Sequence, residues 1–128
     1  MKYLLLVVVL FVSCKKADKS LEACYMQEGT LTIADIPCDA LEKNSLHRKV
    51  YYFETDNDDF MEKFASSYDK LQVKEKPEGF DVRIRLFYHH GKETDTICMG
   101  SFFGIAVNGR EMEDSPELLT LVKGKIYK

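Results

Sequence analysis

Four cysteines and three histidines are the side chains of this 128-residue sequence best suited to redox, metal or nucleophilic chemistry. No two of the cysteines form a Cys-x-x-Cys pair, so the spacing excludes a thioredoxin-type redox motif and a zinc ribbon. Cys98 lies in a strand-like run, residues 96–99, where a buried and inert thiol is more common than a reactive nucleophile. The cysteines therefore favour a structural role over redox or metal chemistry.

His89 and His90 are adjacent, and neighbouring residues of a strand point to opposite faces of its sheet. One metal ion could bind both side chains only if a turn redirected them, and His47 is the remaining histidine. No third ligand is identifiable. We therefore interpret 89–92 as a surface turn and expect neither a metal nor another cofactor, with a pH-sensitive contact as the alternative.

Motifs with a specific catalytic mechanism are missing from the sequence. It contains no Gly-x-Ser-x-Gly elbow, no glycine-rich phosphate loop and no His-Glu-x-x-His pair. Cys98 with one of the three histidines is the only conceivable cysteine–histidine pair. We expect a protein that is not an enzyme, and a Cys98-dependent hydrolase remains a minor alternative.

The first fourteen residues have the order of an export signal: Lys2, an apolar run over residues 3–12, then Ser13 and Cys14. Ten helical residues span about 15 Å, half of a bilayer core of about 30 Å, so the run is too short to cross a membrane. Residues 11–14, Phe-Val-Ser-Cys, resemble the lipobox of bacterial lipoproteins. The resemblance implies that Cys14 carries a diacylglycerol thioether and becomes the first residue after cleavage.

This resemblance implies a location as well as a modification. We predict a signal peptide at 1–13, a short tether at 14–20 and a single domain at 21–128. Several acyl chains would hold Cys14 at a membrane almost permanently. Lys15, in place of the aspartate that retains some lipoproteins at the inner membrane, favours an outer membrane with the domain facing the periplasm. The alternative is a buried N-terminal strand or helix with an incidental cysteine.

With Cys14 assigned to lipid, three cysteines remain in a compartment where disulfides persist. Cys24 and Cys38 are the expected pair, because both lie in an irregular N-terminal third and would close a loop of about 14 residues.

Acidic side chains gather in two segments, which together could attract a basic protein partner. These residues are Asp56, Asp58, Asp59, Glu111, Glu113 and Asp114. The first segment lacks the glycine and glutamate of an EF-hand loop, so capping of a helix explains it better. A net charge of −3 excludes the basic footprint of a nucleic-acid binder.

Hydrophobic patterning predicts an α+β fold, a small antiparallel meander of about four strands with two helices packed on one face. Clean alternation over 81–88 indicates a sheet with one wet face, and Asn108-Gly109 indicates a tight hairpin. The helices should begin at a cap on Thr55 or Asp56, ending near Leu71, and at Ser115-Pro116. Further strands are expected at 30–34, 49–54, 94–101, 102–107 and 110–112, and a short helix at 37–43.

These observations favour a membrane-anchored, non-catalytic protein-binding module outside the cytoplasm. An immunity-type lipoprotein that covers the active site of an incoming toxin is one version, and an accessory subunit of an envelope complex is another. The competing class is a carrier of lipid or another small molecule. Its pocket would be lined by aromatic residues, namely Tyr51, Phe53, Phe87, Phe102 and Phe103.

Overall fold

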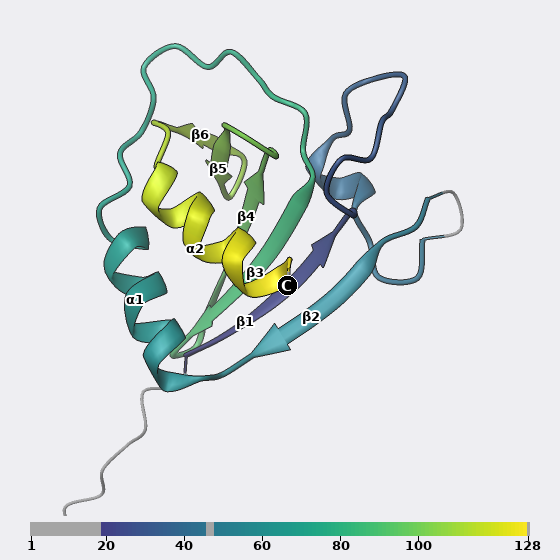
Figure 1. The fold of residues 1–128 in the computed structure, drawn as a ribbon. Coiled ribbons are helices and arrows are strands. Elements are labelled where there is room, and N and C mark those ends of the chain that lie inside the picture. The colour runs from purple at the N-terminus through teal and green to yellow at the C-terminus, as the bar shows by residue number, and fades with distance from the viewer. Residues whose placement is uncertain (1–18, 46–47, 128) are drawn as a thin grey trace, which may run out of the picture.

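A computed structural model describes residues 19–45 and 48–127. The predicted signal peptide, Cys14 and His47 lie outside the described residues. The described chain is an α+β domain in which six antiparallel strands form one sheet and two helices pack against it, as Figure 1 shows. The predicted fold class is therefore confirmed, and the sheet has six strands where a meander of about four was expected.

The elements follow one another along the chain in the order drawn in Figure 1. They are β1 (Lys19–Tyr25), a 3-10 helix η1 (Cys38–Ala40), β2 (Tyr51–Thr55), α1 (Asp58–Tyr68), β3 (Ile84–His90), β4 (Glu93–Met99), β5 (Ile105–Val107), β6 (Arg110–Met112) and α2 (Pro116–Ile126). The strand order across the sheet is β2-β1-β3-β4-β5-β6. β2 and β6 are therefore its two edges.

The first strand is not where the sequence predicts it. The segment 30–34 forms no strand, and Leu31 and Ile33 are almost fully exposed at 95% and 109%. β1 instead begins at Lys19, inside the predicted tether, and lies between β2 and β3. Leu21 and Ala23 alternate with polar neighbours and are buried, which is the period-2 pattern of a strand with one covered face.

Asn57, not Thr55 or Asp56, caps α1. Its side-chain oxygen accepts a hydrogen bond from the Phe60 N–H at 3.0 Å, while the Thr55 hydroxyl accepts from the Asn57 N–H at 3.2 Å. The helix ends at Tyr68, three residues before the predicted end. The predicted cap of α2 is confirmed, because the Ser115 hydroxyl accepts from the Leu118 N–H.

The turns of the β3–β4 and β5–β6 hairpins differ in how well the sequence predicted them. His89 and His90 belong to β3 instead of the turn, which Gly91 makes with a φ of +61°. Asn108 and Gly109 have φ values of +50° and +82°, so the predicted tight turn between β5 and β6 is confirmed.

Each face of the sheet is covered differently. Both helices pack on one face, here called the helix face, where Phe64, Leu118 and Val122 join strand residues in the main core. The opposite face, here called the open face, is covered at one end by the segment between β1 and β2, in which Met26, Ile36 and Leu41 are buried around η1. In the described chain, neither helix is long and apolar enough to cross a membrane.

Candidate functional site

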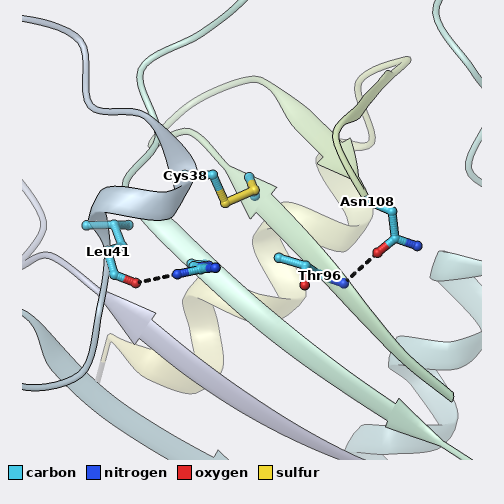
Figure 2. The surroundings of a disulfide bond; sticks show 6 residues. Cys38, Leu41, Thr96 and Asn108 are labelled. Atoms are coloured by element: carbon cyan, nitrogen blue, oxygen red, sulfur yellow. Dashed lines mark hydrogen bonds between the residues drawn. A yellow bond between two sulfur atoms is a disulfide. The ribbon is translucent and has the colours of Figure 1, made fainter.

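A disulfide fastens η1 to the open face of the sheet, as Figure 2 shows. It joins Cys38 to Cys98 of β4, with the Cα atoms 5.7 Å apart, so the predicted Cys24–Cys38 pairing is wrong. The strand registers explain the choice, because Arg85 of β3 lies between Cys24 of β1 and Cys98 in one row across the sheet. Arg85 also donates a hydrogen bond to the Leu41 carbonyl at 3.3 Å, which helps hold η1 beside β4.

Neither Cys98 nor Cys24 offers a reactive thiol. Cys98 has no free thiol while the bond is intact, so it does not serve as the nucleophile of the hydrolase alternative. Cys24 is free but buried, and burial raises the pKa of its thiol. A thiol with a raised pKa is a poor nucleophile at neutral pH.

Beyond the disulfide, the open face carries a row of five hydrogen-bonded side chains across β2, β1, β3 and β4. They are Glu54, Tyr52, Glu22, His89 and Thr94, here called the polar row. The Tyr52 hydroxyl lies 2.6 Å from Glu22 and 3.0 Å from Glu54. His89 Nε2 lies 2.5 Å from Glu22 Oε2, and its Nδ1 lies 2.8 Å from the Thr94 hydroxyl.

The contacts within the polar row favour the ionised form of Glu22 and fix the position of its carboxylate. Glu22 and Glu54 face each other across β1 and β2, an arrangement in which two carboxylates repel. The hydrogen bond from Tyr52, followed by the contact with His89, lowers the pKa of Glu22. The same Glu22 contact raises the pKa of Tyr52, so the phenol stays protonated at neutral pH. The row therefore presents an ionised carboxylate that two neighbours hold in one orientation.

A hollow of about 550 Å³ adjoins the polar row where β1 begins and β2 ends. Glu22, Glu54, Asp56 and His89 contribute its charged or ionisable lining, and Ser20 is also at its wall. Of the acidic residues predicted as a binding surface, Asp56 is the one that lines this hollow. Glu22 and Glu54 were missed because they come together only through the β1–β2 register.

The predicted acidic surface as a whole does not form. Asp58 and Asp59 are exposed in the first turn of α1, which follows the edge strand β2. Glu111 lies on β6, the opposite edge of the sheet in Figure 1, followed by Glu113 and Asp114.

Two acids of this second segment bind the domain's own backbone. Glu111 accepts hydrogen bonds from the Glu78 and Gly79 N–H groups at 2.9 and 2.7 Å, which lower its pKa. Asp114 accepts one from the Gly104 N–H at 3.0 Å. These two carboxylates hold loops of the domain in place, so their presence is explained without binding to a partner protein.

A second polar cluster surrounds Asp95 on the helix face. Its carboxylate binds the Tyr68 hydroxyl at 2.6 Å, His90 Nε2 at 2.7 Å and the Asn108 amide at 2.9 Å. Burial opposes ionisation here, but these hydrogen bonds outweigh it and lower the pKa of Asp95. Because Tyr68 comes from α1 and His90 from β3, the cluster joins a helix to the sheet.

Histidines 89 and 90 point to opposite faces, as the sequence predicts for neighbours on a strand, and each has its own carboxylate partner. Residues 19–45 and 48–127 contain no group of three His, Cys, Asp or Glu side chains that could hold a metal ion.

The aromatic residues predicted to line a carrier pocket are scattered. Tyr51 and Phe53 lie on the helix face of β2, and Phe87 lies on the open face of β3. Phe102 and Phe103 are exposed at 83% and 61% in the turn between β4 and β5. The predicted set therefore does not surround one cavity.

The chemistry that the polar row and its hollow support best is recognition of a cation. Carboxylates at Glu22, Glu54 and Asp56 face an open hollow large enough for a lysine or arginine side chain.

Comparison with known proteins identifies no family for this chain. No family model, curated protein or solved structure matches it.

Proposed function

We propose that this protein is a lipid-anchored, extracytoplasmic binding module that holds a basic protein partner against the polar row. The single observation that carries the binding role is the network from Glu54 to Thr94, in which a charged carboxylate is already oriented on an accessible sheet face. Side chains that are ordered before binding lose little entropy when a partner arrives, so their interaction energy is retained as affinity.

The accessibility of the row supports a binding role over a purely structural one. The Glu22 and His89 side chains are 35% and 37% exposed, and Glu54 is exposed at the edge strand. A lysine or arginine of the partner in the hollow would meet three carboxylates and displace water. The same charges would accelerate encounter with a basic partner at low salt.

The proposed compartment rests on two independent features. The Cys38–Cys98 disulfide supports an oxidising compartment, because such bonds persist outside the cytosol and are rare within it. The lipobox-like residues 11–14 support export and acylation at Cys14, and Lys15 favours an outer membrane with the domain facing the periplasm. The concrete version that we favour is an immunity-type protein that covers a basic toxin's active site.

The test is affinity capture from envelope extract with the full chain in mild detergent. The bait is compared with Glu22→Gln/Glu54→Gln, which removes two charges of the row but keeps similar side-chain shapes. Glu62→Gln/Glu75→Gln removes two exposed charges elsewhere and is the matched control. We expect one stoichiometric partner on the wild type and the control, at least tenfold less on the row variant, and release by raised salt.

Two results would contradict the proposal. One is the absence of any stoichiometric partner across several growth conditions. The other is a partner that the row variant retains as well as the control does, which would place binding on a different surface.

A further inference from the structure

The described residues cover one edge of the sheet with an additional segment and leave the other edge uncovered. At β6, Val73 forms a bridge with Met112, and the segment that follows α1 runs along the strand. The Lys74 N–H donates to the Glu111 carbonyl at 3.0 Å, and the Glu113 N–H donates to the Gln72 carbonyl at 2.7 Å. This segment occupies backbone groups that an edge strand otherwise offers to another chain.

In the part of the chain that the structure describes, no such segment lies along β2. Within residues 19–45 and 48–127, β1 is the only strand that pairs with it, and Figure 1 shows β2 at the margin of the sheet. Its sequence, Tyr-Tyr-Phe-Glu-Thr, contains neither the proline nor the glycine that commonly interrupts exposed edges. Among the described residues, no strand occupies the outer backbone groups of β2, and these groups could pair with an added strand.

The charges at the two ends of β2 indicate which kind of strand could pair with it. Arg48 and the exposed Lys49 precede the strand, whereas the exposed Glu54 and Asp56 lie at its end. Two antiparallel copies of this segment would place each basic start beside the other's acidic end. Parallel copies would place like charges together, which is unfavourable.

We propose that β2 pairs antiparallel with β2 of a second copy of this chain, about a two-fold axis at Phe53. An axis perpendicular to the sheet keeps the helices of both copies on one side and pairs residues of the same face. Phe53 then faces its own counterpart, and Tyr52 faces the second copy's Glu54. No two carboxylates of β2 are directly opposite each other in this register.

The interface is small, because the added contact is one strand of five residues on each copy. Interfaces of this size are weak and depend on concentration. Dimerisation goes beyond the proposed function, since it uses the outer backbone groups of β2, although Tyr52 and Glu54 of this strand also belong to the polar row. The two failures are distinguishable, because the dimer is tested at Lys49 and Phe53, which lie outside the polar row, whereas partner binding is tested at Glu22 and Glu54.

The first experiment measures the molar mass of the full chain in mild detergent across a concentration series at low salt. We expect a reversible monomer–dimer equilibrium for the wild type. Lys49→Glu places like charges at both ends of the pairing and should weaken the dimer at least tenfold. The matched control Lys63→Glu, an exposed charge on α1, should leave the dimer unchanged.

The second experiment uses cross-linking, which reports the register directly. Phe53→Cys should form a covalent dimer under mild oxidation, because position 53 faces itself only in the proposed arrangement. Glu62→Cys, exposed on α1, is the control and should give at least tenfold less. A chain that remains monomeric at every concentration, or equal cross-linking by both variants, would overturn the proposal.

Discussion

Cys38 and Cys98 lie 60 positions apart in the chain, and their disulfide holds η1 against the open face of β4. Hydrogen bonds also hold the irregular segment between β1 and β2, among them the Val82 N–H to the Ile36 carbonyl at 3.0 Å and the Arg83 guanidinium to the Thr30 carbonyl at 2.9 Å. The disulfide links the part of the protein with least regular structure to one of the central strands.

Reducing this disulfide should destabilise the domain. In the chain-entropy model, opening a loop of this length costs about 4 kcal/mol of unfolding free energy. Urea unfolding with and without reductant measures the cost, with Cys24→Ala as the control because Cys24 forms no disulfide. Equal midpoints for the wild type in both conditions would show that the bond contributes nothing.

Replacing Asp95 should loosen α1 from the sheet. Asp95→Asn removes the charge that accepts hydrogen bonds from Tyr68 and His90, and we expect a loss of about 1–3 kcal/mol. Chemical denaturation measures the loss, with Glu75→Gln in an exposed loop for comparison. A loss no larger than that of the comparison variant would contradict the linking role of Asp95.

Stability should depend on Glu22 in a pH-dependent way. Because the folded-state pKa of Glu22 is lowered, its contribution is present above its unfolded value of about 4.5 and is lost as pH falls through the folded pKa. Glu22→Gln should therefore be less stable than the wild type at pH 7, and the difference should shrink below pH 4.5. Thermal unfolding at several pH values tests this, and a difference that stays constant down to pH 2 would refute it.

Two glycines with positive φ should respond differently to alanine. Gly109 has open space where a Cβ would lie, so Gly109→Ala costs only backbone strain, about 1 kcal/mol. A Cβ at Gly104 would also collide with the Phe80 ring, and Gly104→Ala should cost about 2–4 kcal/mol. Similar losses for both variants in denaturant unfolding would mean that Phe80 moves aside easily.

The sequence predicted most features that depend on neighbouring residues. Alternation indicated β3, Asn108-Gly109 indicated the hairpin, and Ser115 indicated the start of α2, because each signal acts within a few residues. β1 was not predicted, although Leu21 and Ala23 have the period of a strand. The lipobox-like residues favoured a tether that ended at residue 20, inside this strand.

The features that the sequence did not predict depend on strand register. Cys24 is nearer to Cys38 in the chain than Cys98 is, but Cys98 lies under η1 once β4 is placed beside β3. Glu22 and His89 are 67 residues apart, and only the β1–β3 pairing brings them into contact. No pattern of neighbouring residues indicates such contacts. The disulfide and the polar row could therefore not be predicted without knowing which strands pair and in which register.

The proposed export and acylation at Cys14 are tested most directly by the intact mass of the chain purified from its native membranes. The account predicts a polypeptide that begins at Cys14, carries the added mass of a diacylglycerol group and further acylation, and contains one disulfide. A chain that begins at Met1 with an unmodified Cys14 would contradict the account.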